Sequence, residues 1–248
     1  MSGPRPQSQP APDGSGGEYV TIPAGWVNLE GDLTIPQAAR GVVLFAHGSG
    51  SSRHSPRNQM VARQLNAAGL GTLLMDLLTP DEEAIELQGG MRRFDIDLLA
   101  KRLVHAIDWL TVTQRTSELP IGLFGASTGA AAALVATAMR PLVVRAIVSR
   151  GGRPDLAGPA LASVRAPTLL IVGGNDEQVI ALNRQAYAQL TGEKRLDIVP
   201  GATHLFEEPG TLEQVARLAT EWFLRCLQQP RTPPEFTQPQ PGQGAPTG

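Results

Sequence analysis

A serine flanked by glycines joins a strand-like apolar run to a stretch of small, helix-forming residues. Residues 121–126 read Ile-Gly-Leu-Phe-Gly-Ala, and Ser127 is followed by Thr128, Gly129 and an alanine-rich run that reaches residue 138. A sharp strand-to-helix turn needs little side-chain bulk on either side of such a serine, because neighbouring backbone passes close to it. The pattern therefore predicts a turn that holds Ser127 Oγ clear of a sheet, where a base can reach it.

The motif alone does not decide the fold. In a chain with 27 glycines, a Gly-x-Ser-x-Gly motif can occur by chance. The serine of such a motif can also serve only as the cap of the following helix. The apolar strand before the motif and the helical run after it are the context that the strand-to-helix turn requires. We therefore favour the turn over a plain glycine-rich loop.

Two further polar residues follow strand-like runs later in the chain. Asp176 comes after the apolar run 167–172, and His204 comes after the run 195–200. Each residue lies just beyond the carboxyl end of a predicted strand, which is the edge where open α/β sheets build their sites. We therefore expect Ser127, Asp176 and His204 to meet at one edge of the sheet.

The chemistry of these side chains suggests a role for each. A serine hydroxyl needs a base to remove its proton, and histidine, with an ordinary pKa of about 6.5, suits that task near neutral pH. We predict that Ser127 is the nucleophile, that His204 is the general base and then the general acid, and that Asp176 orients the imidazole. Asp176 can alternatively serve only as a helix cap, in which case Glu177 or Asp155 would be the acid.

A tetrahedral intermediate needs hydrogen-bond donors for its oxyanion. The backbone N–H of Thr128, the residue after the nucleophile, is one predicted donor. The second is expected from the loop 47–52, where the N–H of Ser49 is favoured over that of Gly48. His47 is expected to shape this loop rather than to react.

With these motifs in place, the chain resembles α/β-hydrolases, and in particular the small single-domain members of the dienelactone hydrolase-like group. The resemblance spans residues 42–223. It implies an α/β-hydrolase fold with a nucleophile turn at 125–129, the acid at Asp176, the histidine at His204 and the oxyanion loop at 47–52. Dienelactone hydrolases carry a cysteine where this chain has Ser127, so their lactone substrate is not carried over.

Strand-like and helical patterns alternate along the chain, which predicts a mostly parallel sheet with helices on both faces and no separate cap domain. We expect one domain over residues 18–228, between Pro/Gly/Gln-rich segments 1–17 and 229–248 that are predicted to be disordered. The expected strands are a pair within 19–35 and single strands at 41–46, 71–77, 121–126, 143–148, 168–172 and 195–200. The expected helices are 56–68, 94–112, 127–139, 177–190 and 210–227, with a short one between 148 and 168.

Composition excludes several classes of protein. A net charge of −2 provides no basic face for nucleic acid, and the apolar stretches fall short of the roughly 18–20 residues of a membrane span. The N-terminus lacks the pattern of a signal peptide, and the single Cys226 cannot form an internal disulfide, so a cytoplasmic protein is expected. Cys226 falls on the apolar side of a predicted helix and is expected to pack in the core. No His/Cys/Asp cluster has metal-ligand spacing, and neither metal nor cofactor is expected.

Two features bear on the substrate. The connection between residues 148 and 168 is too short for a lid, so the site is expected to be open and to favour small or accessible acyl groups. The charged loop 78–93 either walls the pocket or is a solvated connection, and the second interpretation is favoured. Arg53 and Arg57 lie near the oxyanion loop, where pairing with nearby carboxylates is favoured over binding an acidic substrate.

The sequence therefore predicts a serine hydrolase that cleaves small or accessible carboxylic esters through an acyl-enzyme. One alternative is a nucleotide-binding oxidoreductase, suggested by Gly48-x-Gly50 after a strand, although Arg53 stands where a third glycine is needed. Another alternative is a non-catalytic scaffold that retains a hydrolase fold. No pattern indicates an oligomeric state.

Overall fold

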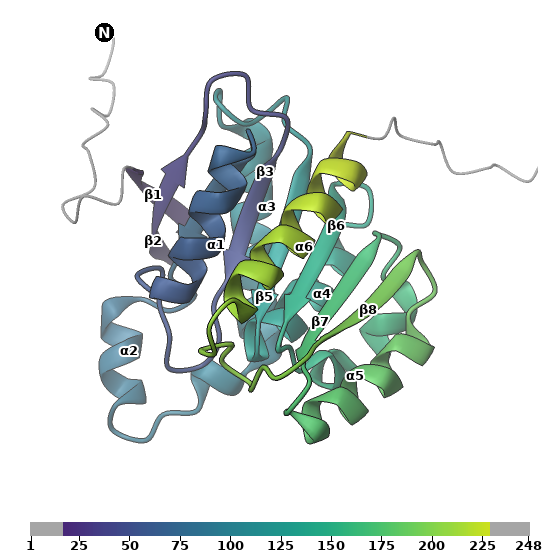
Figure 1. Ribbon diagram of the computed structural model, residues 1–248. Coiled ribbons are helices and arrows are strands. Elements are labelled where there is room, and N and C mark those ends of the chain that lie inside the picture. Colours follow the sequence, from purple (N-terminus) through teal and green to yellow (C-terminus); the bar gives the residue numbers. More distant parts are fainter. Residues whose placement is uncertain (1–16, 229–248) are drawn as a thin grey trace, which may run out of the picture.

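Eight strands form one sheet in the computed structural model, which describes residues 17–228 (Figure 1). The strand order is β1-β2-β4-β3-β5-β6-β7-β8; β1 pairs antiparallel with β2 and β2 with β4, and all other neighbours are parallel. The predicted mostly parallel sheet is therefore confirmed, while the expected terminal disorder falls on residues 1–16 and 229–248, outside the described part. The strands are β1 (Glu18–Ala24), β2 (Val27–Thr34), β3 (Val42–Ala46), β4 (Gly71–Met75), β5 (Ile121–Ala126), β6 (Val144–Arg150), β7 (Thr168–Gly173) and β8 (Lys194–Val199).

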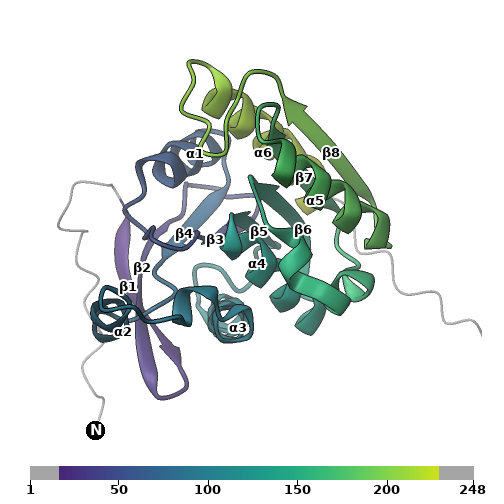
Figure 2. The ribbon, with the colours of Figure 1, turned by 90° about the horizontal axis from the view of Figure 1, so that it is seen from below.

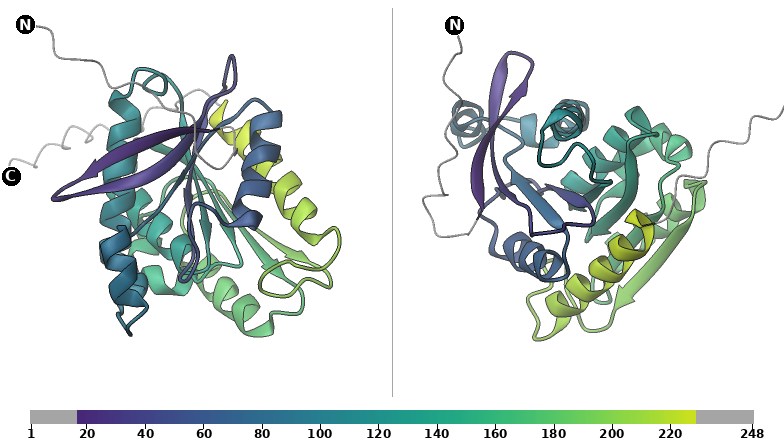
Figure 3. Two further views of the ribbon diagram at one scale, coloured as in Figure 1. Left: turned by 90° about the vertical axis from the view of Figure 1, so that its left-hand side faces the viewer. Right: turned by 90° about the horizontal axis from the view of Figure 1, so that it is seen from above.

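Helices cover both faces of the sheet, as Figures 2 and 3 show. One face carries α1 (Pro56–Ala67) and α6 (Thr211–Leu227), which pack against each other and against the strands. The other face carries α3 (Ile96–Val112), α4 (Thr128–Met139), the 3₁₀ helix η2 (Pro154–Ser163) and α5 (Glu177–Gln189). Two apolar clusters, one on each side of the sheet, form the core.

Local sequence explains where these elements begin and what they bury. Strands β3, β5 and β7 are buried along their whole length, because a parallel strand covered on both faces reads as a continuous apolar run. Helix α1 starts at Ser55, whose side chain accepts a hydrogen bond from the Asn58 N–H, with Pro56 in the first turn. Helix α3 starts in the same way at Asp95. The long elements consequently begin and end close to their predicted residues.

Helix α4 is buried on nearly all sides, and its composition accounts for that position. Ala130–Ala133 have no exposed surface, and the helix packs between the sheet, α3 and η2. Alanine side chains let the helix axis approach its neighbours closely without voids or overlaps. The helix that follows Ser127 is thus held in the core, and this packing also fixes the position of the nucleophile turn.

The charged segment after β4 differs from the favoured interpretation. It folds into α2 (Pro80–Glu86) and the 3₁₀ helix η1 (Arg92–Phe94), and the carboxylates of Glu82 and Glu86 are buried instead of solvated. Arginines that follow in the chain make this burial tolerable, because a buried carboxylate needs a paired, hydrogen-bonded cation. The pairs are Glu82–Arg92 at 2.9 Å, Glu82–Arg102 at 2.8 Å and Glu86–Arg93 at 2.9 Å.

Cys226 packs on the inner side of α6 and is 3% exposed, as predicted. Burial raises the pKa of the thiol to about 11. We expect no reaction with a thiol reagent at pH 8 in the native protein and full reaction in guanidinium chloride, because the thiolate is the reactive form. The unfolded thiol ionises at lower pH than the folded one, so the thiol lowers folding stability as the pH rises from about 9 to about 11. Rapid native labelling would contradict a core position.

Candidate active site

Ser127 sits in a strained turn between β5 and α4. Its backbone angles are φ 50° and ψ −123°, a region that residues with a side chain rarely occupy. The glycines of the motif make room for this turn: a methyl group added at Gly125 would lie 2.4 Å from Ala130 Cα, and one added at Gly129 would lie 2.3 Å from the Ala46 carbonyl oxygen. The predicted strand-to-helix turn is therefore present, and close backbone approach is the reason for both glycines.

The structure brings His204 and Asp176 together from two different loops. Nδ1 of His204, which follows β8, lies 2.7 Å from Oδ2 of Asp176, which follows β7. The two loops meet where a methyl group at Gly173 would lie 2.5 Å from the carbonyl oxygens of Ala202 and Thr203. With Nδ1 donating to the carboxylate, Nε2 is left as the basic nitrogen of a neutral imidazole.

The two alternative acids have other surroundings. Asp155 forms a two-point ion pair with Arg153, through Nε at 2.9 Å and Nη2 at 2.8 Å. Glu177 lies in the first turn of α5, directly after the Asp176 cap position. Of the three carboxylates, only Asp176 is hydrogen-bonded to His204 in the described residues.

Ser127 and His204 border the same turn, residues 151–153, at the end of β6. The Arg153 N–H donates to the Ser127 carbonyl oxygen at 3.0 Å, and a methyl group at Gly151 would lie 3.6 Å from His204 Cε1. Within residues 17–228 the structure shows no hydrogen bond between Ser127 Oγ and the imidazole. Catalytic hydrogen bonds are often long in unliganded enzymes and tighten when substrate binds.

The loop after β3 passes directly against the nucleophile. A methyl group at Gly48 would lie 2.9 Å from Ser127 Cβ, so only glycine fits there. His47 is buried; its Nδ1 donates to the Gly48 carbonyl oxygen at 2.9 Å and its Nε2 accepts from the Leu77 N–H at 3.1 Å. Both ring nitrogens are thus used to shape the loop, which is the role expected for His47.

The predicted oxyanion donors lie next to each other. The N–H of Thr128 is in the first turn of α4, where backbone N–H groups have no partner within the helix. The Ser49 N–H donates to Thr128 Oγ1 at 3.0 Å, so it is already engaged in this structure. The Gly-x-Ser-x-Gly motif predicts the backbone donor of Thr128 but gives no indication of its side chain.

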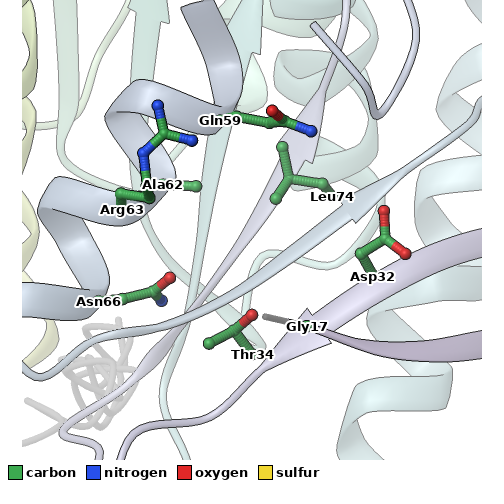
Figure 4. A pocket seen from close by; sticks show the side chains of 8 residues that line it. All are labelled: Gly17, Asp32, Thr34, Gln59, Ala62, Arg63, Asn66 and Leu74. Atoms are coloured by element: carbon green, nitrogen blue, oxygen red, sulfur yellow. The ribbon is translucent and has the colours of Figure 1, made fainter. Parts of the chain in front are cut away.

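Arg53 and Arg57 are paired with carboxylates, as favoured from the sequence. Arg53 contacts Asp76 and lies 2.8 Å from Glu30, and Arg57 lies 3.0 Å from Glu207. Near this group a hollow with a cavity volume of about 30 Å³ lies between α1 and strands β2 and β4 (Figure 4). None of the predicted catalytic or oxyanion residues lines this hollow.

A buried arginine supports the histidine loop, and the sequence patterns did not single it out. Arg150, at the end of β6, donates to Asn58 Oδ1 at 3.3 Å and stacks 5.9 Å above the ring centre of Phe206, two residues after His204. Burial and the positive charge of Arg57 lower the Arg150 pKa to about 10, so the guanidinium is charged at neutral pH. The position of Arg150 just after a predicted strand is visible in the sequence, but its contacts depend on the tertiary structure.

A second, smaller hollow borders the oxyanion loop. Its cavity volume is about 10 Å³, roughly the space of one water molecule, and it is lined by residues 47–50, three buried leucines (Leu77, Leu78 and Leu99), and the charged Glu83 and Arg93. The segment after β4 therefore does wall a hollow beside the site, which was the less favoured interpretation of that segment.

The described residues form neither a metal-binding cluster nor a membrane-spanning helix. Residues 17–228 contain no group of three or more His, Cys, Asp or Glu side chains placed to hold a metal ion. Among the helices within this range, none has both the length and the apolar character needed to cross a bilayer.

Comparison with known proteins identifies the family. The model of the dienelactone hydrolase family matches residues 29–229. The chain belongs to the dienelactone hydrolase family. Its α/β-hydrolase fold agrees with this assignment, and the family supports a hydrolase.

Similar proteins of the family and fold are known from several bacteria. The crystal structure of a dienelactone hydrolase from Anabaena variabilis is 61% identical, covers 85% of this chain and 97% of that chain, and has a TM-score of 0.84. A Mycobacterium tuberculosis protein named as a phosphoribosyl transferase is 59% identical over 210 residues, which are 85% of this chain but 46% of that protein. This chain thus spans about half the length of that relative. An α/β serine hydrolase without a lid from Xanthomonas campestris shares the fold at 19% identity, with a TM-score of 0.67 and coverage of 86% and 96%.

Proposed function

We propose that this protein hydrolyses small carboxylic esters through an acyl-enzyme on Ser127. The observation that carries the proposal is the pairing of His204 Nδ1 with Asp176 Oδ2 at 2.7 Å, at the sheet edge where Ser127 occupies its strained turn. This pairing leaves Nε2 of a neutral imidazole free to take a proton. A nucleophile, an oriented base and nearby backbone donors together meet the requirements of acyl transfer.

The reaction then follows from the position of each group. Ser127 Oγ attacks the ester carbonyl carbon while His204 Nε2 takes the hydroxyl proton, and the carbonyl oxygen becomes an oxyanion held by the Thr128 N–H and the oxyanion loop. His204 returns the proton to the leaving alcohol, and the acyl group stays on Ser127. Water, deprotonated by His204, releases the acid and restores the serine. Asp176 stabilises the imidazolium in both halves of the reaction.

The surroundings of the site favour short acyl groups. The hollow beside the oxyanion loop has a cavity volume of only about 10 Å³, so a long acyl chain does not fit there. The connection from β6 to β7 contains only η2 and has no inserted domain that would bury a long chain. We propose that acetyl to butyryl esters are turned over faster than longer ones.

Phosphoribosyl transfer is not proposed for this chain. The name belongs to a protein of which this chain matches less than half, and the matched 210 residues necessarily overlap most of the range that fits the dienelactone hydrolase family. A non-catalytic scaffold remains the competing function, because a fold does not guarantee an activity. The ester assay separates it from the proposed function.

The test is hydrolysis of p-nitrophenyl esters from acetate to decanoate at pH 6 to 9. We expect the wild type to turn over the short esters and to react with a fluorophosphonate probe, and we expect Ser127→Ala to lose both activities. Ser163→Ala is the matched control, since Ser163 is an exposed serine at the end of η2. A folded wild type that neither hydrolyses any ester nor reacts with the probe would overturn the proposal in favour of a scaffold.

A further inference from the structure

The side chain of Thr128 lies between the oxyanion loop and the nucleophile turn. Its Oγ1 accepts the Ser49 N–H at 3.0 Å, and the residue is only 5% exposed. In the part of the chain that the structure describes, the hydroxyl proton of Thr128 has no acceptor. A nearly buried hydroxyl that accepts one hydrogen bond but donates none is unusual, because buried polar groups normally form all the hydrogen bonds they can.

The surroundings of this hydroxyl indicate what it can donate to. The loop that carries Ser49 passes so close to the nucleophile that a methyl group added at Gly48 would lie 2.9 Å from Ser127 Cβ. Thr128 follows Ser127 directly and begins α4, so its polar groups lie at the positive end of a helix dipole. A negative charge that forms on the substrate at Ser127 therefore develops one residue away from an unused O–H donor.

The bond from Ser49 makes this donor stronger. A hydroxyl that accepts a hydrogen bond is polarised and donates more strongly in turn. The same bond removes rotational freedom from the Thr128 side chain, so less reorganisation is needed when charge develops. The Ser49 N–H, expected from the sequence as a direct donor to the oxyanion, is occupied in the same contact.

We propose that the Thr128 hydroxyl is a catalytic donor to the oxyanion, and that the Ser49 N–H acts through it. This inference rests on the proposed esterase function. Thr128 then supplies two donors, its backbone N–H and its Oγ–H, and the hydroxyl proton stays on Thr128 throughout. Ser49 is a positioning residue in this arrangement.

The test compares variants that remove the hydroxyl with one that keeps it. Thr128→Val preserves the shape without the hydroxyl, Thr128→Ala removes it with less bulk, and Thr128→Ser retains it. We expect Val and Ala to lower kcat for p-nitrophenyl acetate by about 10²–10³-fold with little change in KM, and Ser to stay within about fivefold of the wild type. Affinity for a short alkyl boronic acid, whose adduct with Ser127 carries the tetrahedral oxyanion, should fall in parallel with kcat.

Thr137→Val is the matched control. Thr137 is also a buried threonine of α4, but its Oγ1 donates to the Ala133 carbonyl oxygen within the helix, away from the site. It should keep wild-type kcat and boronic acid affinity, while circular dichroism and thermal unfolding report the stability of every variant.

Each outcome decides between the two proposals. Wild-type kcat and inhibitor affinity in folded Thr128→Val or Thr128→Ala would overturn the donor role, as would a Thr128→Ser variant as impaired as Thr128→Val. Loss of thermal stability with unchanged kcat would show that the hydroxyl only fixes the loop. A wild type without esterase activity would instead overturn the proposed function, before any variant is compared.

Discussion

Replacing His204 with alanine is expected to lower kcat for short esters by about 10⁴–10⁶-fold, because Ser127 would then lose the base that takes its proton. Asp176→Asn is expected to cost about 10⁴-fold, since an amide can hold the imidazole in the wrong tautomer. Both values are measured as steady-state kcat on p-nitrophenyl acetate with folded protein.

A double variant and a control variant test whether Asp176 and His204 act as one unit. Residues that act as one unit are non-additive, so Asp176→Asn combined with His204→Ala should be no slower than His204→Ala alone. Asp155→Asn is the control, because Asp155 is paired with Arg153 and does not contact His204. If Asp155→Asn were as damaging as Asp176→Asn while both remained folded, the assignment of the acid would be wrong.

The largest expected loss of stability comes from Gly129→Ala. The added methyl group would lie 2.3 Å from the Ala46 carbonyl oxygen and 2.4 Å from that of His47, so the end of β3 or the start of α4 must move. Neither segment can move freely, because both are packed in the core. We expect the free energy of unfolding to fall by about 3 kcal/mol or more, measured by urea denaturation.

Gly89→Ala separates this steric effect from the ordinary cost of replacing a glycine. Gly89 has a φ of 98° and nothing within 4 Å of an added methyl group, so only backbone strain of about 1–2 kcal/mol is expected. Equal losses in the two variants would contradict close backbone contact at Gly129.

The elements that a local pattern can specify were predicted well. The buried strands β3, β5 and β7 are continuous apolar runs, and helices α1 and α6 show capping residues or a helical apolar spacing. The segment after β4 was interpreted wrongly as a solvated connection. Its buried Glu82 is made tolerable by Arg102, which lies in another helix, and a local pattern carries no information about such a partner.

Local sequence patterns were enough to predict the succession of strands and main helices along the chain, the sharp turn at Ser127 and the placement of Asp176 and His204 after strand ends. These features depend on the spacing of apolar residues and on the conformational freedom of glycine, and both act over a few residues. The pairing of His204 with Asp176 rather than Asp155, and the contact of Arg150 with Phe206 in the histidine loop, became visible in the folded protein. The same holds for the hydrogen bond from the Ser49 N–H to Thr128 Oγ1, which joins residues 79 positions apart. Such contacts cannot be predicted locally, because the packing of the whole core brings the separate loops to one edge of the sheet.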